Sequence, residues 1–248
     1  MKGNYSLQLY SVHDLAEKNF EQAVADVAKL GFKTVEPCAF FDRTADEVCA
    51  LMEKHGLTIG STHSSWKDLR PTKLYETIAF HKAIGNKNYI MPGADLSTLE
   101  KIEDFCNVVN YAQPILAAEG INLSYHNHSH EFVVMPWGST IHSELEARTD
   151  LDFQLDIFWL YNAGVDPLAA IDRLLPRVSS IHLKDGLRAT ADTPARGKSL
   201  GEGGAPVKDV YEKALALGLP MVVESEGRDP DSLSEVTRCV KYLESIEA

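Results

Sequence analysis

The chain has 248 residues, of which 44% are hydrophobic and 24% charged, and this ordinary globular composition excludes an intrinsically disordered protein. Its 36 acidic and 24 basic residues give a formal net charge of −12, with no three basic residues in a row, so we expect it to bind neither nucleic acid nor an anionic membrane. The longest uninterrupted apolar runs, such as 157–161, have five residues, which is far too short to span a bilayer.

The four cysteines show no CxxC spacing, and a chain of this length needs no disulfides for stability. The first residues also lack the apolar stretch of a secretory signal. We therefore expect a cytoplasmic protein with reduced thiols.

Glycines divide the chain at regular intervals. Five of them follow a helical pattern and precede an apolar run: Gly31, Gly56, Gly85, Gly120 and Gly218. Glycine just past the end of a helix is a common stop signal, because it adopts the left-handed conformation without strain. The repeat of helix, glycine and strand predicts stacked βα units and a parallel sheet.

Eight strands are predicted along the chain, at residues 6–10, 34–38, 57–63, 87–91, 121–127, 151–157, 178–184 and 220–226. Helical patterns lie between them, as in Phe20–Leu30, where apolar residues recur at steps of three and four. Eight such units in about 250 residues predict an α/β fold, a single-domain (β/α)8 TIM barrel over residues 1–248. An open doubly wound sheet is the alternative, but the chain has neither a GxGxxG motif nor a P-loop.

Strand alternation places polar side chains on the inward face of the last four strands. Apolar neighbours occupy the other face and leave inward a set of residues near the strand ends: His126, His128, Asp156, His182, Lys184 and Glu224. Barrel interiors are usually filled with branched apolar residues, and buried charges are costly unless they are paired or bind a metal. The pattern predicts a metal site at the C-terminal face of the barrel, where such folds carry their active sites.

Each of these residues also has a plainer interpretation. Asp156 and Glu224 could cap loops, and His182 could be a hydrogen-bonded core histidine. Lys184 could pair with its neighbour Asp185 or contact substrate. The coordination sphere needs one more ligand, which we expect to be His126 or Glu131.

Further candidates lie on other strands and loops. His63 ends the third strand and Trp66 follows it, so each is either a substrate contact or a residue of the rim. Glu36, on the inward face of the second strand, is expected to bond to a metal ligand, to the lysine or to substrate. The glycine-rich stretch 201–204 predicts a mobile loop, with a phosphate cradle as the alternative.

Seven short motifs in the right order resemble those of the xylose isomerase-like TIM-barrel superfamily, and the resemblance covers essentially the whole chain. They are Leu7-Gln8-Leu9-Tyr10-Ser11, Val35-Glu36, the His-Asn-His-x-x-Glu-Phe segment that starts at His126, Leu155-Asp156-Ile157, His182-Leu183-Lys184-Asp185, Gly201-Glu202-Gly203 and Val223-Glu224. That superfamily includes sugar isomerases, ketose 3-epimerases, hydroxypyruvate isomerase, inosose dehydratase and endonuclease IV.

The resemblance implies a divalent metal held by an acidic residue after the fifth strand and by Asp156, His182 and Glu224 on the next three. This chain departs from the epimerase pattern at the first position, where His126 stands in place of glutamate. Glu131, five residues later, could replace that ligand. The departure argues against a symmetric mechanism with two glutamates.

We therefore expect a metal-dependent isomerase or epimerase that acts on a sugar or keto-sugar through an enediolate, with Mn²⁺, Co²⁺, Fe²⁺, Mg²⁺ or Zn²⁺ bound. Glu224 or Glu131 would be the base, and Lys184 would stabilise the oxyanion. Substrate contacts are expected from His63, Trp66, His128 and Glu36.

The alternatives are a metal-dependent lyase that acts on an inosose or a 3-keto glycoside, a non-catalytic sugar-binding barrel, and an abasic-site endonuclease. The expected partner is a small carbohydrate, and a homodimer is one option for assembly.

Overall fold

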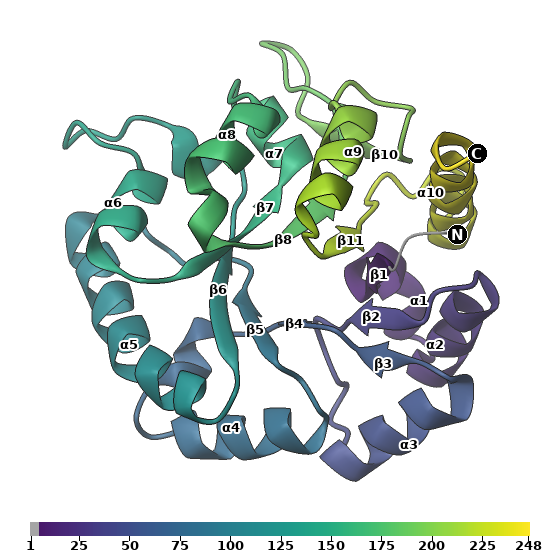
Figure 1. Ribbon diagram of the computed structural model, residues 1–248, viewed down its shortest axis with the longest axis horizontal. Coiled ribbons are helices and arrows are strands. Elements are labelled where there is room, and N and C mark those ends of the chain that lie inside the picture. The colour runs from purple at the N-terminus through teal and green to yellow at the C-terminus, as the bar shows by residue number, and fades with distance from the viewer. Residues whose placement is uncertain (1–4) are drawn as a thin grey trace.

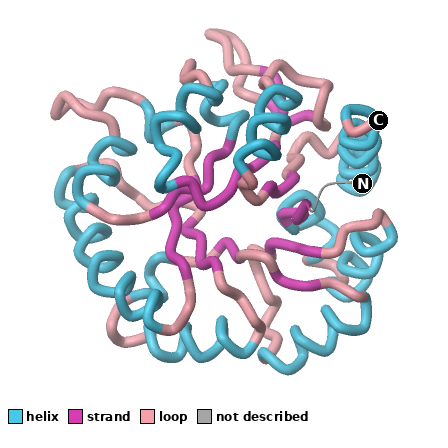
Figure 2. Tube along the Cα trace, viewed as in Figure 1, coloured by secondary structure: helices cyan, strands magenta, loops and turns pink. Residues whose placement is uncertain are grey.

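The computed structural model describes residues 5–248 and consists of a parallel sheet rolled into a barrel with helices on its outside (Figure 1, Figure 2). In sheet order the strands are β3 (Thr58–Ile59), β2 (Thr34–Glu36), β1 (Tyr5–Gln8), β11 (Met221–Val223), β8 (Val178–Leu183), β7 (Asp152–Asp156), β6 (Asn122–His126), β5 (Asn88–Met91) and β4 (Thr62–His63). The predicted (β/α)8 barrel is confirmed.

The helices follow the strands as βα units require. They are α1 (His13–Ala16), α2 (Phe20–Lys29), α3 (Ala45–His55), α4 (Leu74–Ala83), α5 (Leu99–Ala118), α6 (Ile141–Arg148), α7 (Ile157–Asn162), α8 (Pro167–Leu174), α9 (Val207–Leu217) and α10 (Ser232–Ile246). Short 3-10 turns, η1 (Leu9–Val12), η2 (Trp66–Leu69), η3 (His130–Phe132) and η4 (Leu175–Arg177), lie near the strand ends, and a small hairpin of β9 (Asp185–Leu187) and β10 (Arg196–Lys198) follows β8.

β3 and β4 are two halves of one barrel strand, which explains how nine strands make an eightfold barrel. β3 pairs with β2 on one side, and β4 pairs with β5 on the other. The backbone amide of Gly60, between the halves, still donates to Val35 O at 3.0 Å, and that of His63 donates to Pro37 O at 2.9 Å. This strand therefore closes the ring.

The glycine signals also hold. All five glycines predicted to end helices have positive φ angles, between 64° at Gly56 and 96° at Gly31. At its other end, α3 begins with a capping box in which the Thr44 and Glu47 side chains bond to each other's backbone amides. A capping box at its start and a glycine at its end thus define the length of α3.

Strand ends differ from prediction at several places that matter for the site, among them the end of β11, which stops at Val223 and so leaves Glu224 just past the strand. The first strand stops at Gln8 because residues 9–12 form η1. The strand predicted over 151–157 stops at Asp156, whose carboxylate accepts the backbone N–H of Trp159 at 2.9 Å and so caps α7.

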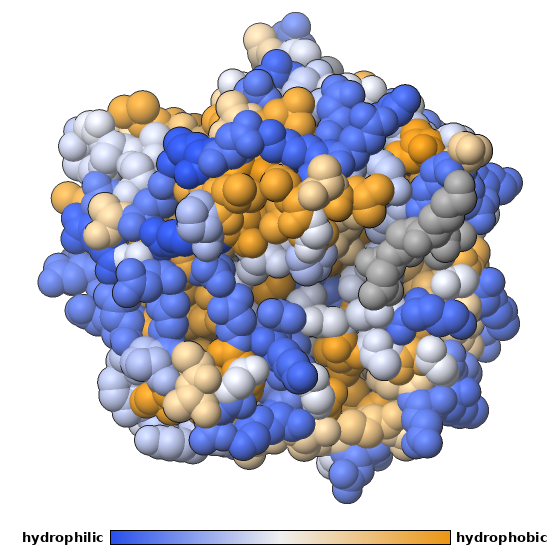
Figure 3. Space-filling model, in the orientation of Figure 1, coloured by the Kyte–Doolittle hydropathy of each residue, from blue (hydrophilic) through white to orange (hydrophobic). Residues whose placement is uncertain are grey.

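Apolar side chains fill the layer between strands and helices, among them the fully buried Leu155, Ile181 and Val223. The face seen in Figure 3 is mostly hydrophilic at its edge, with hydrophobic residues in smaller patches nearer the centre. No helix within residues 5–248 combines the length and apolarity needed to cross a membrane.

Candidate metal centre

Four potential metal ligands meet inside the barrel, one from each of four neighbouring strands or the residue that follows: His126, Asp156, His182 and Glu224. Each offers a ligand atom, and these atoms all lie within 4.8 Å of one another. All four side chains are buried, with at most 4% of Glu224 exposed. Strand alternation therefore predicted a real convergence of side chains that are distant in sequence.

Asp156 has one oxygen in use and one free. Its Oδ1 caps α7, but its buried Oδ2 has no hydrogen-bond partner within residues 5–248. The nearest cationic or imidazole atoms are Lys184 Nζ at 3.8 Å and His126 Nε2 at 4.0 Å. Burial raises the pKa of this carboxyl above its ordinary value, against the attraction of Lys184. An orphaned buried oxygen of this kind fits a bound cation.

The protonation of His126 follows from its neighbour Gln154. The Gln154 amide nitrogen donates to Glu36 Oε2 at 2.8 Å, so its Oε1 must accept, and it lies 3.0 Å from His126 Nδ1. Burial, followed by the charge of nearby imidazoles, holds the pKa of His126 well below its usual range. The neutral ring therefore carries its proton on Nδ1, and Nε2 presents a lone pair on the side of Asp156.

His182 lies between two carboxylates. Its Nδ1 is 3.0 Å from Glu224 Oε2, and its Nε2 is 2.8 Å from Glu36 Oε1. Burial disfavours the charged ring, but Glu36 and Glu224 outweigh it and raise the pKa of His182 to about 10. Loss of one proton would free one nitrogen for a metal while the other still donates to a carboxylate, as metal-bound histidines commonly do.

Glu36 is the buried hub beneath these ligands. Its Oε1 accepts from Gln8 at 2.7 Å and from His63 Nε2 at 3.0 Å, and Ser61 donates to its Oε2. Burial opposes ionisation, yet His63 and His182 hold the pKa of Glu36 well below its usual range. Glu36 does not line the cavity, and its contact with His182 is the bond to a metal-ligand candidate that is one of its predicted roles.

Lys184 is 1% exposed and faces three carboxylates. Its Nζ is 2.5 Å from Glu226, 3.2 Å from Glu224 and 3.8 Å from Asp156. Although burial favours the neutral amine, Glu224 and Asp156 raise the pKa of Lys184 above its ordinary value. The ammonium is therefore the local counter-charge of the site.

Asp185 does not pair with Lys184, because its carboxylate binds the glycine-rich loop. Its oxygens accept the backbone N–H groups of Gly201 at 3.0 Å, Gly203 at 2.9 Å and Ala205 at 2.9 Å. A Cβ atom on Gly203 would collide with this carboxylate. The alternative of a phosphate cradle at 201–204 is thus wrong, since an aspartate of the chain already occupies the amide nest.

Two predicted residues lie apart from the cluster. Glu131 is buried, but its carboxylate accepts from the Tyr125 hydroxyl at 2.9 Å and from the His128 amide at 2.8 Å. Trp66 packs on Phe105, with ring centroids 5.5 Å apart. Neither lines the cavity or joins the ligand cluster, because the loop after β6 turns back on itself and η2 turns Trp66 onto α5.

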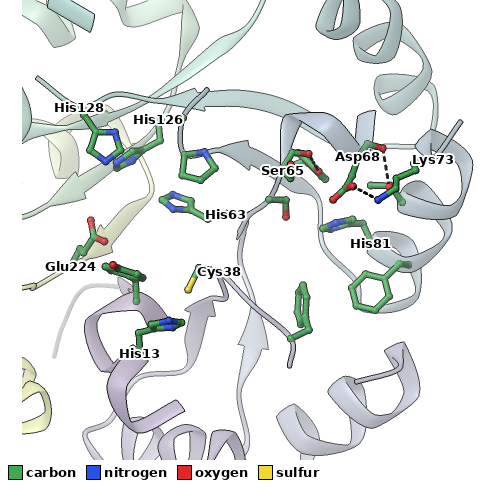
Figure 4. A pocket seen from close by; sticks show the side chains of 18 of the residues that line it. His13, Cys38, His63, Ser65, Asp68, Lys73, His81, His126, His128 and Glu224 are labelled. Atoms are coloured by element: carbon green, nitrogen blue, oxygen red, sulfur yellow. Dashed lines mark hydrogen bonds and ion pairs between the residues drawn. The ribbon is translucent and has the colours of Figure 1, made fainter. Parts of the chain in front are cut away.

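A cavity of about 1110 Å³ opens at the C-terminal ends of the strands. Five predicted residues line it: His63, His126, His128, Lys184 and Glu224. Figure 4 shows the imidazoles of His63, His126 and His128 grouped near Glu224 at one end. The His63 ring stacks on His182 at 5.2 Å and places Nε2 2.7 Å from Gln154 Oε1.

Sequence reasoning missed the roles of Gln154, Glu226 and His81. The first two had a usable signal, since strand alternation places Gln154 on the inward face of β7 and extends to Glu226, three residues past the end of β11. His81 had none, because it lies on α4 and reaches the cavity only through the packing of that helix.

Residues 24–245 match the family model described as Xylose isomerase-like TIM barrel. No curated protein matched in the sequence search. Among solved structures, a sugar phosphate isomerase/epimerase from Parabacteroides distasonis ATCC 8503 is 19% identical with a TM-score of 0.81, over 98% of this chain and 96% of that one.

Two further structures are similar. The probable 3-DHS dehydratase AsbF from Bacillus anthracis is 13% identical with a TM-score of 0.72, over 98% of this chain and 99% of that one. A xylose isomerase-like TIM barrel protein from Mycobacterium smegmatis, in complex with magnesium, is 16% identical with a TM-score of 0.69, over 92% and 87%. At these identities the likeness establishes the fold alone.

Proposed function

Because the chain belongs to the xylose isomerase-like TIM barrel family, we propose that it is a divalent-metal-dependent isomerase or epimerase of a keto-sugar. The observation that carries this proposal is the convergence of His126, Asp156, His182 and Glu224 within 4.8 Å, with Asp156 Oδ2 buried and without a partner. Two imidazoles and two carboxylates suit Mn²⁺, Co²⁺, Fe²⁺, Mg²⁺ or Zn²⁺.

A bound divalent cation would act as a Lewis acid, polarising the substrate carbonyl and acidifying the neighbouring C–H bond. Glu224 is the proposed base, because it is the one predicted carboxylate base that lines the cavity. Lys184 would donate to the oxygen that gains negative charge, since its ammonium lines the same cavity 3.2 Å from Glu224. As it turns toward that oxygen, it would release Glu224 to accept a proton.

One base suffices for isomerisation, because it can carry the proton from one carbon to the next on the same face. His128 is a neutral imidazole beside this centre, where burial lowers its pKa to about 4. As a neutral ring it would orient a substrate hydroxyl, whereas epimerisation would need a protonated group that returns the proton to the opposite face.

A lyase is the second candidate. The observation that favours it is His126, which stands where the resemblance implies a glutamate able to act as a second base. With one base on a single face, the same proton abstraction leads to loss of a β-hydroxyl or β-alkoxy group from an inosose or a 3-keto glycoside.

Deuterium exchange tests the proposal. Metal-loaded protein in deuterium oxide is incubated with ketoses, inososes and 3-keto glycosides, and each substrate is followed by proton NMR. We expect deuterium at the carbon next to the carbonyl, a loss of that exchange in Glu224→Gln, and its retention in the control Glu131→Gln. The absence of exchange into every substrate would overturn the proposal.

A further inference from the structure

The cavity continues well beyond the metal-centre candidates. Its second part, here the distal arm, lies between the loop after β2, η2 and α4 and is lined by Phe40, Ser65, Asp68, Lys73, Phe80 and His81. Figure 4 shows Asp68, Lys73 and His81 grouped on the side away from His126 and Glu224. A single small sugar chelated at the metal centre would leave this arm unfilled.

His81 gives the distal arm a fixed hydrogen-bond donor. The backbone amide of Asn88 donates to Asn86 Oδ1 at 3.2 Å, which orients the Asn86 side chain, so that its Nδ2 lies 2.9 Å from His81 Nδ1. Nδ1 must therefore accept, and the ring proton resides on Nε2. Nε2 has no protein partner within residues 5–248, although His81 is only 5% exposed and lines the cavity.

Aromatic side chains form the walls beside this donor. Phe40 and Phe80 meet edge to face with ring centroids 5.0 Å apart, and Tyr89 lies 4.8 Å from the His81 ring. Flat apolar walls with a few oriented polar groups are typical of small-molecule pockets, and this combination suits a ring that bears hydroxyl groups. The ring C–H groups would pack on the aromatic faces while one oxygen accepts from Nε2.

The charges of the distal arm disfavour a phosphate. Asp42, Asp68 and Glu76 line it against the single cation of Lys73, and that ammonium already lies 3.0 Å from Asp68. An anion placed here would meet uncompensated carboxylates. The amide nest of the glycine-rich loop is also taken, by Asp185.

We propose that the distal arm binds a second, uncharged ring, so that the substrate is a keto-sugar carried in a glycoside and is not a sugar phosphate. This inference rests on the proposed function, because the keto-sugar ring is assigned to the metal centre. It deepens that function by naming the substrate class.

Calorimetric binding to metal-loaded protein tests the inference apart from catalysis. The probes are fructose, fructose 6-phosphate and maltulose, in which a glucosyl ring is attached to fructose. We expect maltulose to bind at least tenfold more tightly than fructose, and fructose 6-phosphate to bind no better than fructose. Equal binding of maltulose and fructose, or a preference for the phosphate, would overturn the inference.

Variants locate the second ring. In His81→Phe, maltulose affinity should fall by about fivefold to tenfold, as for the loss of one buried hydrogen bond, while fructose affinity stays within twofold. His142→Phe is the control, because His142 is a buried histidine on α6 outside the cavity. If His81→Phe does not fold, Phe80→Ala tests the wall in the same way, and an equal loss for both sugars would contradict the assignment.

Failure of the two proposals can be told apart. Deuterium exchange into fructose with no preference for maltulose would leave the enzymatic proposal intact and overturn the binding of a second ring in the distal arm. A preference for maltulose without exchange into any substrate would support the second ring and overturn the enzymatic proposal.

Discussion

The His182 ring nitrogen Nε2 lies 2.8 Å from Glu36 Oε1, although 146 residues separate the two in sequence. Glu36 ends β2, and β1 and β11 lie between that strand and β8, which carries His182. The contact therefore crosses the barrel interior. It holds the ring that also faces Glu224, so a carboxylate outside the cavity orients a candidate metal ligand.

Replacement of Glu36 should weaken metal binding without removing a ligand. In Glu36→Gln the amide keeps the shape of the side chain but loses the charge that His182 and His63 share. We expect metal affinity to fall by about 10-fold to 100-fold, the usual effect of losing such a partner. Competition with a chelator measures it, and an affinity equal to that of the unmodified chain would contradict this role.

The alternative between His126 and Glu131 can be decided with a matched pair of variants. We expect His126→Gln to lose bound metal in elemental analysis and Glu131→Gln to retain about one ion per chain. Glu131 should not be needed for the metal, because its two carboxylate oxygens already accept hydrogen bonds from the Tyr125 hydroxyl and the His128 amide. Retention by the first variant and loss by the second would show that the loop after β6 rearranges around the metal.

Lys184→Met should separate charge balance from catalysis. The methionine chain fills nearly the same volume but removes the cation that Glu224 and Asp156 share. We expect kcat to fall by about 100-fold, as for the loss of a donor to a developing oxyanion. Metal affinity should rise severalfold, because the cation no longer competes for the two carboxylates. Parallel losses of affinity and kcat would instead make Lys184 a structural residue.

Much of the site could be predicted because strand alternation is a local property. Once β7 and β8 are placed, Asp156 and His182 must face inward, and parallel strands bring their ends together. Paired strands also keep neighbouring side chains in register, with Asp156 opposite His182 in the ladder. The convergence of these two side chains can therefore be predicted without knowing the paths of the loops.

The rest depends on segments whose paths are set by packing. Glu131 and Trp66 lie on short 3-10 turns after strands, where no two-residue period applies. His81 enters the cavity from α4, whose apolar face is weakly marked, and contacts with Asn86 and Tyr89 fix the orientation of its ring. Such positions follow from the whole fold and not from a window of sequence.

His81 should also make stability depend on pH. Burial lowers its pKa from the ordinary 6.5 to about 4, against a small opposing effect of Asp68. The unfolded chain therefore takes up this proton first as pH falls. The contribution of the neutral ring is complete above about pH 6.5 and is lost progressively down to about pH 4.

The size of this effect follows from the pKa difference. Between pH 7 and pH 5, the shift corresponds to a loss of about 2 kcal/mol in the free energy of unfolding. In His81→Phe this contribution is absent, so its urea-unfolding free energy should fall less over that interval, whatever its stability at pH 7. Identical pH dependence in the two proteins would mean that the pKa of His81 is the same in the folded and unfolded chains, which contradicts a neutral ring held by burial and by its contact with Asn86. That result would also contradict the fixed Nε2–H donor of His81, on which the proposed binding of a second ring in the distal arm rests.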